Sequence, residues 1–386
     1  MEGCSLMYRD IVTFIREMYG TDEFLPLHEP KFFGNEQRYV NETIESTFVS
    51  SLGKFIPIFE EQVAAYVGAK YAVATSNGTS ALHVALKLLG VDKESEVITQ
   101  PLTFIATANA ISYCGASPIF IDVDRKSMGL SAEKLEEFLS ESTYINDDGS
   151  CINRTTKKVI RAVVPMHTFG HPSQIEEIVS VCDRYNIKVV EDSAESLGSR
   201  YRDKHTGTFG ELGIFSFNGN KIITSGGGGM IVTDNEALAK RAKHITTTAK
   251  VPHPYEYMHD EIAYNYRLSN LNAALGVAQM ENLDLLVTKQ RELASNYEQF
   301  FKNHQVSFVT EPKEAYSNYW LNAIILEDRE AREAFLKYSN ESGIMTRPIW
   351  RLMNKLKMFE GAQKGDLSNA LWLEDRVVNI SSSVIL

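Results

Sequence analysis

The sequence predicts an α/β protein with a mostly parallel central sheet and a second, smaller lobe toward the C-terminus. Between about residues 70 and 235, short runs rich in Val, Ile, Phe and Tyr alternate with longer helical patterns. This alternation is typical of parallel strands joined by crossover helices that cover both faces of a sheet. After residue 235 come a loop rich in His, Pro and Tyr, a long helical stretch and a smaller α+β region. The 386 residues suffice for two such lobes.

Seven apolar runs are the expected strands, and their near-continuous hydrophobicity indicates burial on both faces. They are Tyr71–Ser76, Glu96–Gln100, Pro118–Val123, Val159–Met166, Lys188–Glu191, Gly213–Phe217 and Met230–Thr233. Helical patterns separate them, for example at Ser80–Leu89 and Ser173–Tyr185, and a long connecting helix is expected from Ser269 to about Phe301. We expect three segments: residues 1–60 packing on the large lobe and the substrate site, a large α/β domain at 61–250, and a smaller C-terminal domain at 251–386.

Bulk properties narrow the possible functions. The net charge of −11 argues against a nucleic-acid-coating role. No window holds the roughly 18 uninterrupted apolar residues of a membrane helix, and the N-terminus lacks the pattern of a secretory signal, so a cytoplasmic protein is expected. The cysteines have neither CxxC pairing nor zinc spacing, which predicts structural thiols and no metal site; they are Cys4, Cys114, Cys151 and Cys182.

The segment Ser76–Ser80 lies between a predicted strand and a predicted helix. Gly78 permits close backbone approach, and Thr79 offers a hydroxyl group just where the free N–H groups of a helix begin. Together these features can bind an anion. The same residue types are also ordinary helix caps, so this segment alone leaves both interpretations open.

Three charged side chains are further candidates. Asp192 follows a buried strand, where it either caps the next turn or pairs with a cationic ring nitrogen. Lys221 stands between aromatic residues and the glycines at 226–229, either solvated in a loop or buried as a nucleophile toward aldehydes. Arg267, close to Asn265 and ahead of the long helix, belongs to a surface or interface patch, or binds a carboxylate or phosphate.

The order of these features suits pyridoxal 5′-phosphate (PLP). A phosphate site comes first, then an acid after a buried strand, then a lysine 29 residues later (221 − 192). PLP requires a phosphate clamp, an acid that faces its pyridine nitrogen and an amine for covalent attachment.

Five segments carry a specific resemblance: SNGTSAL, PLTFIATANAI, VEDSAESLGS, GIFSFNGNKIITSGGGGM and YNYRLSNLNAALGVAQ. They resemble the DegT/StrS-type nucleotide-sugar aminotransferases, from about residue 30 to the C-terminus. The resemblance implies the fold type I (aspartate-aminotransferase-like) architecture, with a mixed, mostly parallel seven-stranded sheet in the large lobe. It also implies PLP as the cofactor and a homodimer with shared active sites.

The resemblance assigns roles to matching residues. Lys221 would hold PLP as a Schiff base and move the proton, and Asp192 would pair with the pyridinium nitrogen. The other implied cofactor contacts are the phosphate ligands Gly78, Thr79 and Ser216, the ring-stacking Phe104, the partner-subunit phosphate ligand Asn265, and Glu195 beside the ring hydroxyl.

Glu195 stands where relatives often carry Gln or His, and a charged carboxylate there would repel a phenolate. It is therefore expected to be protonated or turned away. The expected substrate residues are His167, Arg267 and Trp350, with a structural role for His167 equally open.

The segments GNEQRYVNETIESTFVSS and TRPIW are most similar to the branch that aminates UDP-4-keto-6-deoxy-N-acetylhexosamines in bacterial diamino-sugar and legionaminic-type (nonulosonic acid) pathways. The implied reaction is C4 transamination of UDP-2-acetamido-2,6-dideoxy-4-keto-hexose with L-glutamate as donor, in the service of lipopolysaccharide or related glycans. The alternatives are a PLP-dependent sugar dehydratase, a C3 aminotransferase, and a non-catalytic PLP-fold sensor or scaffold. Relatives that dehydrate the sugar have histidine where Lys221 stands, so lysine favours transamination.

Overall fold

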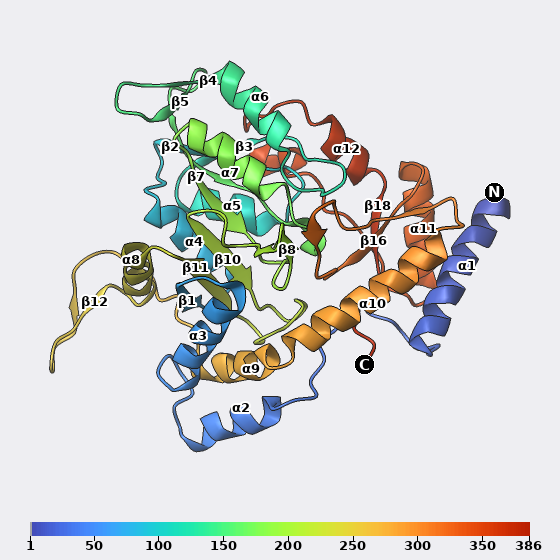
Figure 1. Ribbon diagram of the computed structural model, residues 1–386, viewed down its shortest axis with the longest axis horizontal. Helices are drawn as coiled ribbons and strands as arrows, with labels where there is room; N and C mark the ends of the chain where they lie inside the picture. The colour runs from blue at the N-terminus through green and yellow to red at the C-terminus, as the bar shows by residue number, and fades with distance from the viewer. Residues whose placement is uncertain (1) are drawn as a thin grey trace.

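The computed structural model describes residues 2–386, with side chains from residue 6 onward. A nine-stranded sheet forms the centre of the large lobe (Figure 1). Seven strands follow the order β1-β11-β10-β7-β6-β2-β3, and the hairpin β4–β5 pairs with β6. The bounds are β1 Tyr71–Thr75, β2 Ser95–Thr99, β3 Ser117–Phe120, β4 Thr143–Ile145, β5 Cys151–Asn153, β6 Val159–Val164, β7 Lys188–Asp192, β10 Leu212–Ser216 and β11 Gly229–Thr233.

The seven predicted strands are confirmed, each within a few residues of its expected ends. β11 runs antiparallel to both of its neighbours, β1 and β10, whereas the other neighbours on the path pair in parallel. The sheet is therefore mixed and mostly parallel, as expected.

Alternating side chains of each strand enter two different hydrophobic layers, because successive strand residues point to opposite faces. On one face, Val190 and Ile214 pack with residues of α4 and α8. On the other face, Val189 packs with α6 and α7, and Phe215 packs with α3, α9 and α10. The bounds are α3 Phe55–Val67, α4 Gly78–Leu88, α5 Ile105–Tyr113, α6 Ala132–Ser142, α7 Ile175–Arg184, α8 Glu236–Thr246, α9 Asn270–Met280 and α10 Leu283–Phe301.

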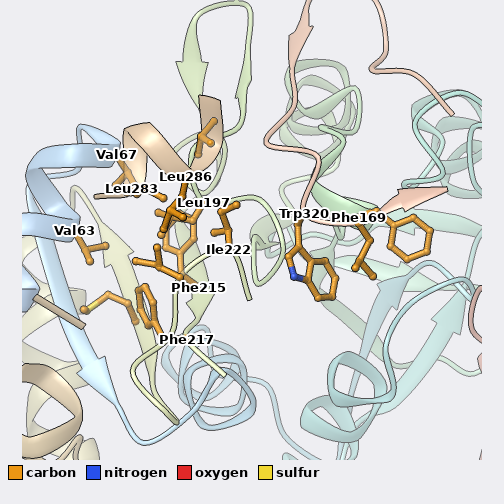
Figure 2. Close-up of a cluster of buried hydrophobic side chains, with 14 of the residues drawn as sticks. Val63, Val67, Phe169, Leu197, Phe215, Phe217, Ile222, Leu283, Leu286 and Trp320 are labelled. Carbon is orange, nitrogen blue, oxygen red and sulfur yellow. The ribbon is translucent and has the colours of Figure 1, made fainter. Parts of the chain in front are cut away.

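Figure 2 shows part of the hydrophobic cluster that joins this second face to the helices. Phe215 and Phe217 lie near Leu283 of α10, with Val63 of α3 close by. Trp320 belongs to the same cluster and lies beside Phe169. This continuous core connects the sheet to the start of the C-terminal lobe.

The C-terminal lobe contains a four-stranded antiparallel sheet in the order β14-β16-β18-β17, packed against α10 and α11. Helix α1 of the N-terminal segment packs against α11 in this lobe, whereas α2 and α3 contact α9. The domain boundaries proposed from the sequence stay predictions. The bounds are α1 Glu2–Tyr19, α2 Glu36–Glu45, α11 Arg329–Glu341, α12 Ser368–Glu374, β14 Ser307–Phe308, β16 Asn322–Ile325, β17 Arg347–Pro348 and β18 Val377–Ile380.

Smaller elements complete the fold. A three-stranded sheet has the order β15-β8-β9, and the hairpin β12–β13 extends away from the large lobe below α8 (Figure 1). Three short 3₁₀ helices lie in loops. The bounds are β8 Arg200–Tyr201, β9 Lys204–His205, β12 Lys250–Val251, β13 Met258–His259, β15 Ala315–Tyr316, η1 Thr168–Gly170, η2 Met353–Lys355 and η3 Lys357–Phe359.

The long helix expected from Ser269 is in fact two helices, α9 and α10, which meet at Glu281 and Asn282. The side-chain amide of Asn282 donates to the carbonyl of Ala278 at 3.3 Å. Such local side-chain bonds compete with the helical backbone pattern, which is why asparagine is found more often at helix ends than inside.

The cysteines in the described part are buried and unpaired; they are Cys114, Cys151 and Cys182. The side chain of Cys4 lies outside the described residues. None of the helices in residues 2–386 combines the length and the apolar composition that a membrane crossing requires.

Candidate active site

A cavity of about 620 Å³ opens where the carboxyl ends of β1, β7 and β10 meet. Ligands of open α/β sheets commonly bind at this edge. The cavity gathers most of the predicted site residues from segments far apart in the chain; those that line it are Gly78, Thr79, Phe104, Asp192, Glu195, Ser216, Lys221 and Trp350.

One end of the cavity is suited to a phosphate group. Helix α4 begins at Gly78, and its N-cap Asn77 accepts a hydrogen bond from the backbone N–H of Ser80 at 2.8 Å. The capping role considered for this segment therefore falls to Asn77, and the first-turn N–H groups of Gly78 and Thr79 remain at the cavity wall. A Cβ added to Gly78 would lie 3.0 Å from Cβ of Ser216, so glycine keeps this space open.

Asp192 provides a buried acid at the end of β7. Its carboxylate accepts hydrogen bonds from the Thr107 hydroxyl at 2.7 Å and from the backbone N–H of Ala194 at 3.2 Å. It forms no salt bridge with any described residue. Burial raises the pKa of Asp192 above its ordinary value, so a cationic partner in the cavity would stabilise its charged form.

Lys221 lines the cavity, and its side chain is only 12% exposed. Its ammonium group is 3.3 Å from Oε1 of Glu195 and 3.8 Å from the centre of the Trp320 ring. The Trp320 indole N–H donates in turn to the carbonyl of Asn220 at 2.5 Å, which fixes the ring beside the lysine loop. The interpretation of Lys221 as a solvated loop residue does not hold, because the side chain is mostly buried.

Glu195 faces Lys221 from a fully buried position. Its other carboxylate oxygen accepts the backbone N–H of Phe169 at 2.9 Å. Burial raises its pKa to about 7, although the nearby charge of Lys221 opposes this shift. The carboxyl group thus points into the cavity and takes up a proton far more readily than a solvated glutamate does.

Three predicted residues do not reach this cavity. His167 is fully buried; Ser173 donates its backbone N–H to Nδ1 at 3.1 Å, so Nε2 carries the proton toward Glu191 at 3.1 Å. The imidazole therefore has a structural role, which the sequence had left open, and it is not part of the cavity lining. Asn265 and Arg267 are exposed and hydrogen-bonded to each other at 2.8 Å.

Sequence reasoning did not single out Trp320, Arg347 and Arg351, which also line the cavity. Trp320 precedes β16, while Arg347 and Arg351 flank Trp350 in the segment that includes β17. The only available signal was the motif TRPIW, which starts at Thr346 and includes Arg347. Nothing local marks Trp320 as a neighbour of Lys221, because about 100 residues separate them.

These residues fit PLP. The open cradle at Gly78 and Ser216 suits a phosphate, the buried Asp192 forms no ion pair with a described residue, and Lys221 supplies an amine in the same cavity. Phe104, 51% exposed, is an apolar surface for a flat ring.

Comparison with known proteins agrees with this site. Residues 31–386 match the model of the DegT/DnrJ/EryC1/StrS aminotransferase family. The chain belongs to this family. It is a PLP-dependent aminotransferase, and the start of the matched region confirms the extent of the resemblance inferred from the motifs.

Relatives cover nearly the whole chain. It is 37% identical over 362 residues to a GDP-perosamine synthase of Escherichia coli O157:H7, covering 93% of both chains. It is 40% identical over 337 residues to the putative pyridoxal phosphate-dependent aminotransferase EpsN of Bacillus subtilis, covering 87% of this chain and 84% of EpsN. The aminotransferase TlmJ of Streptoalloteichus hindustanus superposes with a TM-score of 0.84 at 24% identity, covering 93% of both chains, which confirms the fold type I architecture.

Proposed function

We propose that this aminotransferase moves an amino group from L-glutamate to C4 of a nucleotide-linked keto-sugar. The main support for this proposal is that Lys221, Asp192 and the N-terminus of α4 line one cavity. Relatives named GDP-perosamine synthase support a nucleotide-sugar acceptor. The cavity volume of about 620 Å³ lies within the range of roughly 300–1,000 Å³ that is typical of small-molecule sites.

Each residue has a distinct task in this proposal. PLP, when bound, supplies an electron-withdrawing ring that stabilises negative charge on the carbon next to the substrate nitrogen. The carboxylate of Asp192 keeps the ring nitrogen protonated, and the Thr107 hydroxyl holds that carboxylate in place. The Nζ of Lys221 would take up the proton that leaves the amino-bearing carbon of the donor and would later give it up again. Gly78 and Thr79 bind the phosphate through backbone N–H groups.

Glu195 is suited to act as a protonated acid beside the ring hydroxyl. A neutral carboxyl group donates a hydrogen bond to a phenolate, whereas an ionised one would repel it. The pKa of about 7, raised by burial, makes the neutral form accessible near physiological pH. A neutral Glu195 would therefore avoid the repulsion that an ionised glutamate would exert at this position.

A homodimer is part of the proposal. Asn265 and Arg267 lie on the surface, away from the cavity of their own chain. A neighbouring subunit would bring Asn265 to the phosphate and Arg267 to the substrate. Size-exclusion chromatography with light scattering tests this assembly, and a monomer that retains full turnover would contradict it.

Two observations point to different nucleotides. The motifs GNEQRYVNETIESTFVSS and TRPIW favour a UDP-linked 2-acetamido-2,6-dideoxy-4-keto-hexose, whereas several relatives carry the name GDP-perosamine synthase. We propose the UDP sugar as the acceptor, with a GDP-linked keto-sugar as the second candidate.

The test follows the two half-reactions separately. The visible absorbance of the PLP-loaded protein is recorded before and after excess L-glutamate, and the release of 2-oxoglutarate is measured. UDP- and GDP-linked 4-keto sugars are then supplied, and the amino sugar is identified by mass spectrometry and NMR. An unchanged absorbance with glutamate would contradict the donor, and turnover with neither nucleotide sugar would contradict the acceptor class.

A further inference from the structure

A second, smaller pocket of about 140 Å³ adjoins the active-site cavity. The two share one wall, because Pro348, Ile349 and Arg351 line both. Basic side chains from α11 and from the loop after β17 gather in the smaller pocket. Its lining consists of Arg329, Arg332, Pro348, Ile349, Arg351, Lys355, Glu374 and Asp375. Because four of these side chains are cationic, this cavity is here called the basic pocket.

Two of the four cations have no partner. Among residues 6–386, the side chains of Arg329 and Arg351 form no hydrogen bond or ion pair. Lys355 differs, because it contacts the carboxylate of Glu374. Both side chains are exposed and line the same pocket, so an incoming anion can reach both guanidinium groups and is attracted by both charges.

Arg332 supplies an independent sign of a missing ligand. It is only 7% exposed, and its Nε has no hydrogen-bond partner. Its other nitrogens contact Glu333, which lies outside the pocket lining, and the carbonyl of Glu374. A buried donor without an acceptor is unfavourable, and Arg332, which lines the pocket, therefore retains one N–H group that no described residue accepts.

The acidic residues of the pocket do not cancel its charge. Four cationic and two acidic side chains line it, and Glu333 contacts Arg332 from outside the lining, which leaves an excess of one positive charge (4 − 3). Glu374 is occupied by Lys355 and by the backbone N–H of Leu352 at 3.0 Å. Asp375 is the remaining acid, and it forms no ion pair within the described chain. Arg329 also belongs to the first turn of α11, where the helix dipole is positive.

The size and chemistry of the pocket indicate the ligand class. A bound water needs about 10–15 Å³ of such space, so about 140 Å³ accommodates a tetrahedral oxyanion with several waters. Guanidinium forks match phosphate oxygens in pairs, which is the reason that arginine predominates where phosphate is recognised.

We propose that the basic pocket binds a phosphate group, and that Arg351 connects this site to the active-site cavity. The phosphate has two possible sources: the diphosphate of the nucleotide-sugar substrate, which rests on the proposed function, or a phosphate compound bound separately from the substrate. In either case Arg329 is a ligand that forms no ion pair with any described residue of the chain.

The experiment uses the PLP-loaded protein and two matched variants of α11. Arg329→Ala removes one cation from the basic pocket. Lys337→Ala removes one cation from the same helix outside it, where the Lys337 ammonium lies 3.9 Å from Glu341 and its side chain is 75% exposed. Isothermal titration calorimetry measures the binding of inorganic phosphate, UDP and GDP, and steady-state kinetics give KM for the nucleotide sugar. The cofactor absorbance of each variant is the control for folding.

Arg329→Ala is expected to weaken the binding of inorganic phosphate and of at least one nucleotide diphosphate by about tenfold or more, while Lys337→Ala leaves both unchanged. A parallel rise in KM for the nucleotide sugar identifies the substrate diphosphate as the source, and an unchanged KM identifies a separately bound phosphate. Equal affinities of wild type and Arg329→Ala, or no saturable binding of any of the three probes, overturn the proposal. Phosphate binding that persists without turnover of any keto-sugar would contradict the proposed function alone.

Discussion

Glu195→Gln tests the electrostatics of the site in the cofactor-free protein. In the folded chain burial raises the pKa of Glu195 from its ordinary value of 4.5 to about 7. Between pH 5 and 7 the folded state therefore holds a proton that the unfolded chain has largely lost. The free energy of unfolding then falls as pH rises, by about 1.4 kcal/mol per pH unit. Between pH 5 and 7 the free energy of unfolding therefore falls by ~3 kcal/mol, and above pH 7 this contribution is absent.

Urea denaturation of the wild type and of Glu195→Gln from pH 5 to 8 measures this effect. Glutamine keeps an oxygen that accepts the backbone N–H of Phe169 but has no proton to lose. The wild type is expected to lose ~3 kcal/mol relative to the variant as pH rises, because shared titrations cancel in the difference. Glu360→Gln, at an exposed position, is the control and should leave the profile unchanged. Parallel profiles for the wild type and Glu195→Gln would refute the reasoning.

Three further substitutions test the site and the core. Lys221→Ala should abolish turnover and remove the absorbance of the covalently held cofactor while the circular dichroism spectrum is retained; measurable steady-state transamination would contradict its role. Asp192→Asn should retain the cofactor but slow the glutamate half-reaction by about 10²-fold or more, since the ring nitrogen loses its counter-charge, and near-normal single-turnover rates would count against that role. Phe215→Ala should lower the free energy of unfolding by about 3–5 kcal/mol in urea titrations, because its fully buried ring contributes to the main core cluster; a loss under 1 kcal/mol would show that the surrounding core collapses into the space.

The central sheet was predictable because its strands are buried on both faces. Val, Ile and Phe runs mark such strands whatever their neighbours are, and all seven were recognised. The β4–β5 hairpin was missed, since Tyr144 and Ile145 of its first strand are exposed and polar turn residues lie around them. Likewise, hydrophobic periodicity did not reveal the break between α9 and α10, because apolar residues of both helices, such as Val277 and Leu283, pack into the same core cluster.

Some residues of the candidate site could likewise be predicted from the sequence, and others could not. Lys221, Asp192 and Gly78 each stand in a motif at the end of a predicted strand, and the order of these motifs along the chain suits PLP. The sequence alone therefore predicted that they share one site, and all three line the cavity. Trp320 and Arg351 reach the cavity through the packing of the C-terminal lobe on the large one, and no local pattern encodes that contact.

The segment Glu191–Glu195 shows how hydrogen bonding separates structural from functional acids. Glu191 accepts from the backbone N–H groups of residues 207, 209 and 210 and from His167, which fills the roughly four acceptor positions of a carboxylate. Asp192 and Glu195 each accept only two such bonds, and one of the donors to Glu195 is Lys221. A saturated buried carboxylate has nothing left to offer a ligand, whereas the two unsaturated ones lie at the cavity wall. Glu191 is therefore a structural residue that fixes β7, and its position in turn holds Asp192 and Glu195 toward the space between them and Lys221.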